Sequence, residues 1–312
     1  ANVICWDDDA EKRSLASSKG LRVIGSVSDF DWESIDRLII SPGVPHHFPL
    51  PHPIVSAAVS AGVLIDNDVG LFFQSIATKS WDKFSVRPRI VAVTGSNGKS
   101  TTASLLHHIF LKLGYKSQLA GNIGRGVLDI DPPENNELIV LELSSYQIEV
   151  ARILSPDLAI FTNFSADHLE RHGGIGGYLA AKRRLFTEGC PDYSIIGVDE
   201  LAGLNLAQQL SASIGDESII RVSATKQMRR FDWSIFLDAG YLVEHRKGKQ
   251  IVSTDLKVFD NFVGPLSYKN AASAYAACRA LGMSPRKIVE AMKGFNGLAH
   301  RSQKIGTFNG IT

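Results

Sequence analysis

The segment 89–101 has the residue types and the spacing of a phosphate-binding loop. Residues 90–93 are apolar and mostly β-branched, which is typical of a buried strand. Gly95 and Gly98 follow and permit a tight turn before Lys99 begins a helix. The backbone amides of such a loop, together with the N-terminus of the helix, bind phosphate oxygens. The sequence therefore predicts a nucleotide site in which Lys99 contacts the β- and γ-phosphates.

Two hydroxyl residues, Ser100 and Thr101, follow this lysine, and we expect one of them to hold Mg²⁺. The spacing is Thr-Gly-x-x-Gly-Lys-Ser, which departs from the strict phosphate-loop motif at its first glycine. A strand, a glycine turn and a helix in this order still favour nucleotide binding over the alternative, a plain glycine turn. The residues predicted to contact the nucleotide are Gly95, Ser96, Asn97, Gly98, Lys99, Ser100 and Thr101.

Further polar residues lie at the ends of two apolar strands, which we predict at 138–143 and 158–163. In open α/β sheets, ligands bind at the carboxyl ends of the strands. Glu142 lies at the end of the first strand, where its carboxylate is expected to hold a second Mg²⁺ or a metal-bound water. The alternative for Glu142 is a solvated acid at a strand end. The segment 163–172 follows the second strand and is dense in polar groups, including Asp167, His168 and Arg171.

Strands and helices alternate along the chain, which predicts an α/β fold with a mostly parallel sheet. A first unit has predicted strands at 3–6, 22–25, 37–40 and 63–65, and predicted helices at 10–19, 54–61 and 69–76. The polar segment 79–88 ends in proline and is expected to separate this unit from the second. In the second unit we predict further strands at 90–93 and 194–198, antiparallel ribbons over 219–262, and helices at 99–113, 178–186, 201–211, 270–281 and 285–293.

The composition argues against several classes of protein. A chain of 312 residues with a net charge of +1 gives no support for a general role on nucleic acid or on a membrane surface. The three cysteines, Cys5, Cys190 and Cys278, are far apart and predict neither a disulfide framework nor a zinc site. We find no apolar run near the ~20 residues of a membrane span and no secretion signal, so we expect a cytoplasmic protein.

Several motifs occur in the order found in the Mur ligases, and the chain resembles this family over nearly its whole length. The motifs are Thr94-Gly-Ser-Asn-Gly-Lys-Ser-Thr101, Gly121-Asn-Ile-Gly124, Glu142-Leu-Ser-Ser-Tyr-Gln147, Asn163-x-x-x-Asp-His-Leu-x-Arg-His172, Tyr178-x-x-Ala-Lys182 and Gly297-Leu-Ala-His-Arg301. The Ser-Ser-Tyr-Gln variant resembles the branch that adds D-glutamate to UDP-N-acetylmuramoyl-L-alanine. The resemblance implies a Rossmann-like UDP-binding domain at 1–86 and a P-loop ATP-binding domain with a mostly parallel sheet at 87–298. Residues 299–312 would be a linker and the start of an amino-acid-binding domain.

The activity that the resemblance implies is ATP-dependent amide-bond formation through an acyl phosphate, in the synthesis of peptidoglycan precursors. The catalytic residues that it implies are Lys99, Glu142, His168 and Lys182, with Asp167 and Arg171 supporting the site. The metal-binding residues that it implies are Ser100, Glu142, His168 and Lys182. His168 would ligate the second Mg²⁺ or lie close to the acyl phosphate.

Lys182 is the residue whose interpretation the resemblance changes most. Its neighbours Arg183 and Arg184 indicate a surface lysine on the basic face of a helix. The resemblance instead implies a carbamylated lysine, whose added carboxylate supports a metal ion.

Contacts with the muramoyl nucleotide are implied for Asp7, Ser41, Pro42, Gly43, Asn122, Ser144 and Gln147. Asn270 would lie at the adenine, and Arg301 would lie in the hinge to the third domain. The His-Asn pair of the family pattern before Asn270 is replaced by Leu266-Ser267, which leaves the recognition of the base open.

The chain is expected to be a fragment, because the glycine-rich strand and turn that should precede Val3 and the third domain of the family are absent. We therefore expect ligand binding to survive better than turnover. The expected partners are small molecules, namely ATP, UDP-N-acetylmuramoyl-L-alanine and D-glutamate, with no nucleic acid and no membrane, and we expect a monomer. One alternative is a ligase like folylpolyglutamate synthase, whose phosphate loop should lie near the N-terminus. A non-catalytic nucleotide-binding module is a second alternative, and a generic P-loop ATPase switch, which would leave the Gly121 and Ser144 motifs unexplained, is a third.

Overall fold

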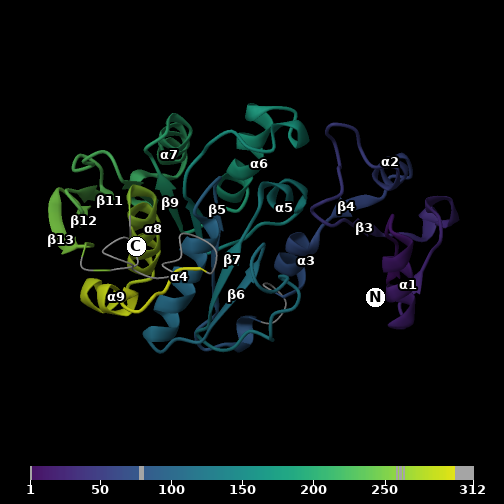
Figure 1. Cartoon of the computed structure of the whole chain (residues 1–312), viewed down its shortest axis with the longest axis horizontal. Coiled ribbons are helices and arrows are strands. Elements are labelled where there is room, and N and C mark those ends of the chain that lie inside the picture. Colours follow the sequence, from purple (N-terminus) through teal and green to yellow (C-terminus); the bar gives the residue numbers. More distant parts are fainter. Residues whose placement is uncertain (1, 77–80, 258, 260–261, 263, 299–312) are drawn as a thin grey trace, which may run out of the picture.

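The computed structural model describes residues 2–76, 81–257, 259, 262 and 264–298 (Figure 1). A small N-terminal part lies at one end of the molecule, and a larger part is built around a single sheet. The elements of the small part are β1 (Ile4–Cys5), α1 (Ala10–Ser18), β2 (Arg22–Val23), β3 (Arg37–Ile39), α2 (Pro53–Ser60) and β4 (Leu64–Asp66). β1 pairs with β2 and β3 with β4, both in parallel, so the predicted strands are present but form two short sheets in the described residues.

The larger part contains a nine-stranded sheet in the order β13-β12-β11-β10-β9-β8-β5-β7-β6. Neighbouring strands from β6 to β11 run in parallel, and β12 and β13 add an antiparallel edge. The strands are β5 (Arg89–Thr94), β6 (Ser117–Gly121), β7 (Leu138–Glu142), β8 (Leu158–Phe161), β9 (Tyr193–Gly197), β10 (Ile219–Ser223), β11 (Trp233–Asp238), β12 (Tyr241–Arg246) and β13 (Lys249–Asp255). The expected α/β fold with a mostly parallel sheet is confirmed.

Helices cover both faces of this sheet, and β5 shows why its residues are apolar throughout. Val91 and Val93 face a core shared with α4, α8 and α9, whereas Ile90 and Ala92 face a second core shared with α3, α5, α6 and α7. Successive side chains of a strand point to opposite faces, so a strand between two helical layers needs apolar residues at every position. The helices are α3 (Asp68–Ser75), α4 (Lys99–Lys112), α5 (Ser145–Val150), α6 (Ile175–Thr187), α7 (Leu201–Ile214), α8 (Pro265–Ala280) and α9 (Pro285–Met292).

Two predictions need correction. The segment 219–262 is predicted to form antiparallel ribbons, which is confirmed for β11, β12 and β13, whereas β10 pairs in parallel with β9 and β11 and extends the parallel sheet. β10 follows helix α7 and so repeats the strand–helix–strand crossover of the rest of the sheet. The short helix α5 was not expected either, because Ser144, which caps it, lies among residues assigned to ligand binding.

Helix α3 joins the two parts. Phe72 and Phe73 are fully buried in the core of the large sheet, although the predicted domain boundary at 86/87 assigns this helix to the first domain. The residues just before α3 also bond across: Asn67 Nδ2 donates to the carbonyl of Gln147 at 2.7 Å, and the amide of Arg152 donates to Asp66 Oδ1 at 3.0 Å. The small part is therefore held against α5 by buried polar contacts.

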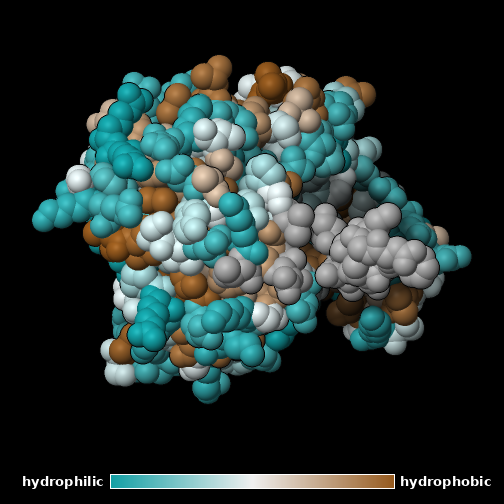
Figure 2. Space-filling model, turned by 60° about the vertical axis from the view of Figure 1, so that its left-hand side comes forward, coloured by the Kyte–Doolittle hydropathy of each residue, from teal (hydrophilic) through white to brown (hydrophobic). Residues whose placement is uncertain are grey.

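The surface is that of a largely polar protein on the face drawn in Figure 2, where hydrophobic residues are scattered between hydrophilic ones. Among the described residues, none of the helices is long and apolar enough to cross a membrane. The two cores described above contain most of the buried apolar side chains of the sheet and its helices, while others, such as Leu201 and Leu266, are exposed.

Candidate active site

The loop between β5 and α4 is shaped by two glycines. Gly95 has φ of 141° and Gly98 has φ of 80°, conformations that L-residues rarely adopt. A Cβ on Gly95 would lie 2.0 Å from Thr162 Oγ1, and one on Gly98 would lie 2.2 Å from Asn270 Oδ1. Both positions therefore require glycine for space as well as for backbone conformation, and the helix N-terminus beyond them is open to a phosphate in the way that such loops use.

The loop is anchored by residues that follow the neighbouring strand β8. Thr162 Oγ1 donates to the carbonyl of Asn97 at 2.7 Å, and Asn163 makes two bonds to the same residue, accepting from its amide at 2.8 Å and donating to its carbonyl at 2.9 Å. Ser96 Oγ donates to the carbonyl of Ser165 at 2.9 Å. Thr162 was not singled out from the sequence; its place at the carboxyl end of a strand next to β5 was the available signal.

Lys99 and Ser100 occupy the first turn of α4, as predicted. Lys99 Nζ donates to the carbonyl of Ser96 at 2.9 Å, so the ammonium lies folded back over the loop that it is expected to serve. Ser100 is buried, at 4% exposure. The lysine charge is thus held beside the amides of the loop, where both attract an anion.

Lys182 is buried at 1% exposure, so the interpretation as a surface lysine is wrong. It lies on α6, and its Nζ donates to the carbonyl of Gly95 at 2.8 Å and lies 4.5 Å from the centre of the Tyr178 ring. Burial and then the nearby positive charge of Lys99 lower the pKa of Lys182 to about 7, although Asp167 opposes this. A substantial fraction of the amine is therefore neutral near pH 7, and only a neutral amine can attack CO₂ to form a carbamate.

Glu142 lies at the end of β7 at 1% exposure, and its Oε2 has no hydrogen-bond partner in the described structure. A buried carboxylate oxygen without a partner is costly unless a cation or a donor joins it. Within the described residues, no group of three or more His, Cys, Asp or Glu side chains is arranged to hold a metal ion. A Mg²⁺ here would therefore take most of its ligands from phosphate oxygens and water, with Glu142 as a protein ligand, which is usual for this ion.

His168 adopts a left-handed conformation with φ of 50° and is half exposed. Its Nε2 lies 3.4 Å from Asp167 Oδ2, and its ring centre lies 5.3 Å from that of Tyr146. The side chains of His168 and Asp167, which are both predicted to serve the site, therefore lie next to each other at the carboxyl edge of the sheet.

Ser144 and Gln147 have a structural role that the sequence did not predict. Ser144 is the N-cap of α5 and accepts from the amide of Gln147, while Gln147 Oε1 accepts from the amide of Ser144, which is a capping box. Gln147 is only 3% exposed. Asn122, by contrast, is exposed, and its amide donates to the carbonyl of Glu142 at 2.8 Å.

In the N-terminal part, Ser41, Pro42 and Gly43 form a turn in which the amide of Val44 donates to the carbonyl of Ser41 at 3.0 Å. The carbonyl of Gly43 accepts from Arg171 Nη1 at 3.1 Å, so this turn is joined to the segment that contains His168. The turn therefore lies against the large part of the chain.

Two other predicted residues, Asp7 and Asn270, lie away from that contact. Asp7 precedes α1, where its Oδ1 accepts from the amide of Asp9 at 2.9 Å and lies 3.8 Å from Lys12 Nζ. Asn270 is buried beside Gly98, at the phosphate loop, and its Oδ1 has no hydrogen-bond partner among the described residues. Arg301 lies outside the described residues.

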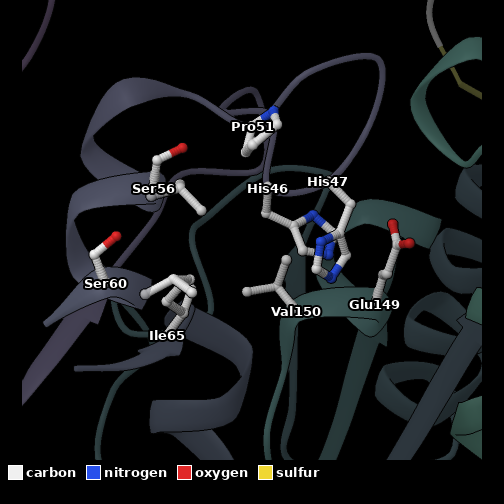
Figure 3. Close-up of a pocket in the computed structure, with 10 residues that line it drawn as sticks. His46, His47, Pro51, Ser56, Ser60, Ile65, Glu149 and Val150 are labelled. Carbon is white, nitrogen blue, oxygen red and sulfur yellow. The ribbon is translucent and has the colours of Figure 1, made fainter. Parts of the chain in front are cut away.

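A cavity of about 480 Å³ lies between the N-terminal part and α5, and Figure 3 shows the rings of His46 and His47 close together beside Val150 and Glu149. Burial lowers the pKa of His46, the Glu149 carboxylate opposes this effect, and the Arg171 guanidinium adds to it. None of the residues predicted to bind a ligand lines this cavity. The candidate site is instead the edge of the sheet around the phosphate loop.

Known proteins resemble this chain over its whole length. Residues 93–278 match the family described as "Mur ligase middle domain". A "UDP-N-acetylmuramoylalanine--D-glutamate ligase" of Cereibacter sphaeroides is 53% identical over 311 residues, which are 100% of this chain and 67% of that protein. The protein of the same name from Roseobacter denitrificans is 53% identical over 310 residues, which are 99% of this chain and 66% of that protein.

Solved structures share the fold at lower identity. A UDP-N-acetylmuramoyl-L-alanyl-D-glutamate--2,6-diaminopimelate ligase gives a TM-score of 0.58 at 20% identity, covering 80% of this chain and 58% of that one. The UDP-N-acetylmuramate-alanine ligase of Thermotoga maritima gives a TM-score of 0.53 at 19% identity, covering 98% of this chain and 66% of that one. At such identity the likeness concerns the fold alone.

Proposed function

Because this chain belongs to the Mur ligase family, we propose that it is an ATP-dependent ligase that joins D-glutamate to UDP-N-acetylmuramoyl-L-alanine in the synthesis of peptidoglycan precursors. Relatives that carry the name of this activity are 52–53% identical to it over essentially its full length. The observation within the site that carries the proposal is the buried Lys182 bonded to Gly95, which brings an amine of pKa about 7 to a phosphate loop.

The reaction that we propose has two chemical steps. An oxygen of the L-alanyl carboxylate attacks the γ-phosphorus of ATP in line, the bond to the β-phosphate oxygen breaks, and ADP leaves. The amine nitrogen of D-glutamate then attacks the acyl carbon, inorganic phosphate leaves, and the amine loses a proton. Each step spreads negative charge over phosphoryl or acyl oxygens, so fixed positive groups around them lower the barrier.

The phosphate loop supplies those positive groups. Loop amides other than those of Ser96 and Asn97, which donate to Asn163, would hold the phosphate oxygens together with the N-terminus of α4, and Lys99 would move from the Ser96 carbonyl to the β- and γ-phosphates. The anchoring bonds from Thr162 and Asn163 keep the loop in one conformation, which reduces the reorganisation needed when ligand arrives.

Mg²⁺ fits the acidic and hydroxyl groups at this edge of the sheet. Ser100 would hold the ion bound to the nucleotide, and the unpartnered Oε2 of Glu142 would ligate a second ion, with His168 close by. When bound, Mg²⁺ would neutralise phosphate charge and orient the γ-phosphoryl group for in-line attack.

Lys182 would act in the carbamylated form. The neutral amine nitrogen bonds to the carbon of CO₂ and a proton is released, which converts a buried cation into a buried carboxylate. That carboxylate would lie beside Gly95 and could support a metal ion, which removes the like-charge repulsion that Lys182 has with Lys99.

The muramoyl nucleotide would lie across the two parts of the chain. The turn at 41–43 and Asp7 would contact it from the N-terminal part, and Asn122, Ser144 and Gln147 from the large part. We propose domains at 1–86 and 87–298, with Asn270 near the nucleotide base and Arg301 in a following hinge. A monomer acting in the cytoplasm, where ATP is available, fits this set of small-molecule partners.

The test is a calorimetric titration of UDP-N-acetylmuramoyl-L-alanine into this chain, with Mg²⁺ and a non-hydrolysable ATP analogue present and dihydropteroate as the comparison. Selective binding of the muramoyl nucleotide is expected. Selective binding of dihydropteroate would instead favour a folylpolyglutamate-synthase-like ligase. Binding of the ATP analogue alone would favour a non-catalytic nucleotide-binding module, and binding of none of them would contradict the proposal.

A further inference from the structure

An unbroken set of side-chain contacts connects the turn at 41–43 with the phosphate loop. It begins at the carbonyl of Gly43, which accepts from Arg171 Nη1 at 3.1 Å. The guanidinium carbon of Arg171 lies 4.9 Å from the centre of the Tyr146 ring, a cation–π distance. Tyr146 in turn stacks on His172, with ring centres 5.1 Å apart and an interplanar angle of 11°.

His172 is the central member of this set and is buried among its other members. It is 2% exposed, its Nε2 lies 2.9 Å from Ser145 Oγ, and its Nδ1 lies 2.8 Å from Glu149 Oε2. Its ring also contacts Tyr178, with ring centres 5.3 Å apart and an interplanar angle of 43°. The imidazole is therefore buried between two aromatic rings, with one nitrogen hydrogen-bonded to Ser145 and the other close to the Glu149 carboxylate without hydrogen-bond geometry, and these contacts restrict its rotation.

Tyr178 carries the contacts on into the phosphate loop. Its hydroxyl lies 3.2 Å from Ser96 Oγ, and Ser96 is the loop residue whose carbonyl accepts from Lys99. The Tyr178 ring also lies under Lys182 Nζ at 4.5 Å. A shift of the tyrosine would therefore move both Ser96 and the buried amine.

We propose that His172 is a positioning residue, which couples binding at the turn 41–43 to binding at the phosphate loop by fixing Tyr146 against Tyr178. The proposal rests on the proposed function, because that function places the muramoyl nucleotide at the turn and ATP at the loop. Neither ligand needs to touch His172. Its role is to keep the two ends of the contact set in one relative arrangement, so that ordering one end lowers the cost of ordering the other.

The experiment measures this coupling in the chain as it stands. The dissociation constant of a non-hydrolysable ATP analogue with Mg²⁺ is measured by calorimetry with and without saturating UDP-N-acetylmuramoyl-L-alanine. The dissociation constant of UDP-N-acetylmuramoyl-L-alanine is then measured with and without the saturating ATP analogue. Coupling between two sites is reciprocal, so both orders must give the same factor, which we expect to be about fivefold or more in the wild type. In His172→Phe, which keeps an aromatic ring but removes both polar contacts, the factor should fall below about twofold.

Two further variants keep the test decisive. Arg171→Leu removes the bond to Gly43 at the partly exposed end of the set and leaves the contacts of His172 in place; it should also lower the coupling factor. His245→Phe is the matched control, since His245 is a buried histidine on β12, outside this set of contacts. Its coupling factor should equal that of the wild type. Thermal unfolding shows which variants fold. If His172→Phe does not fold, the coupling factor of Arg171→Leu tests the proposal instead.

The outcomes separate the two proposals. Failure of the wild type to bind the muramoyl nucleotide would contradict the proposed function. Binding of both ligands by the wild type with a coupling factor near one would overturn the inference alone. A wild-type factor that persists in a folded His172→Phe, or that persists in Arg171→Leu when the first variant does not fold, would overturn it as well. A merely structural role for His172 would lower stability and leave the coupling factor unchanged.

Discussion

Lys182 Nζ donates a hydrogen bond of 2.8 Å to the backbone carbonyl of Gly95, the first glycine of the phosphate loop. This bond ties a residue in the middle of α6 to the end of β5, which are far apart in the sequence. Lys182 is buried there with a second cation, Lys99, close enough to lower its pKa. The site therefore contains two different amines: Lys99, which is expected to bind phosphate, and Lys182, whose lowered pKa favours loss of its proton.

Carbamylation of Lys182 should be detectable and should depend on pH. With a pKa of about 7, lowered from 10.5, the amine is mostly neutral above pH 7 and mostly protonated below it. The carbamate signal from carbon-13 bicarbonate should therefore appear in NMR spectra near pH 8 and fade as the pH falls through 7. Lys182→Arg is the control, because a guanidinium stays protonated. A signal that persists in this variant would come from another amine and would contradict the assignment.

Lys99→Ala should weaken binding of an ATP analogue by about tenfold to a hundredfold, because a charge-assisted hydrogen bond contributes about 1.5–3 kcal/mol. The measurement is calorimetry in the presence of Mg²⁺. Lys112→Ala is the matched control, since Lys112 is exposed in the last turn of the same helix. Equal affinities for both variants would mean that Lys99 does not contact the phosphates.

Gly98→Ala should cost more stability than Gly114→Ala, although both glycines have nearly the same backbone conformation. Their φ angles are 80° and 83°, so both substitutions carry a similar backbone cost of about 1–2 kcal/mol. A Cβ on Gly98 would in addition lie 2.2 Å from Asn270 Oδ1, whereas one on Gly114 would meet nothing within 4 Å. Urea unfolding measures the difference, and only Gly98→Ala should also lose nucleotide binding. Equal costs would show that Asn270 moves aside freely.

Ser144→Ala should destabilise the chain by about 0.5–2 kcal/mol, because it removes a helix cap. Ser284→Ala is the control, since Ser284 is an N-cap whose side chain makes no capping bond. If Ser144 also contacts the muramoyl nucleotide, Ser144→Ala should weaken its binding, whereas Ser284→Ala should not. Unchanged binding would assign Ser144 to the fold alone.

The elements that the sequence predicted well are those in which one physical signal dominates. β5 is apolar at each position from 90 to 93, and α4 begins at Lys99 as the glycines before it required. α5 was missed for two reasons. Its cap, Ser144, is a polar residue of a kind that is equally common in ligand-binding segments, and a helix of six residues is too short to show a periodic pattern.

The sequence correctly predicted that Glu142 and the segment 163–172 lie at the carboxyl ends of strands, but it predicted the wrong environment for Lys182. Its neighbours Arg183 and Arg184 are only partly exposed, so the helix carries a basic stretch while burying one lysine of it. Burial of that lysine depends on Gly95 and Tyr178, which are distant in the sequence, so no local pattern can reveal it. The same holds for Thr162, whose role comes from the pairing of β8 with β5.

Glu142→Gln should have opposite effects on stability and on binding. Oε2 of Glu142 is buried and has no hydrogen-bond partner in the part of the chain that the structure describes, so replacing the charged group by a neutral amide should stabilise the ligand-free chain by about 1 kcal/mol or more. The same change removes a ligand expected to hold Mg²⁺, so the gain in affinity for an ATP analogue on adding Mg²⁺ should shrink by about tenfold or more.

Glu137→Gln is the matched control for that prediction. Glu137 is a buried glutamate just before β7, but its Oε2 accepts from the amide of Glu134 at 2.8 Å. Because its charge already has a partner, this substitution should not stabilise the chain and should leave the effect of Mg²⁺ unchanged. Thermal unfolding without ligand and calorimetry with Mg²⁺ or EDTA measure the two effects. A Glu142→Gln chain that is less stable, yet responds to Mg²⁺ as the wild type does, would show that Glu142 serves the fold and not the metal.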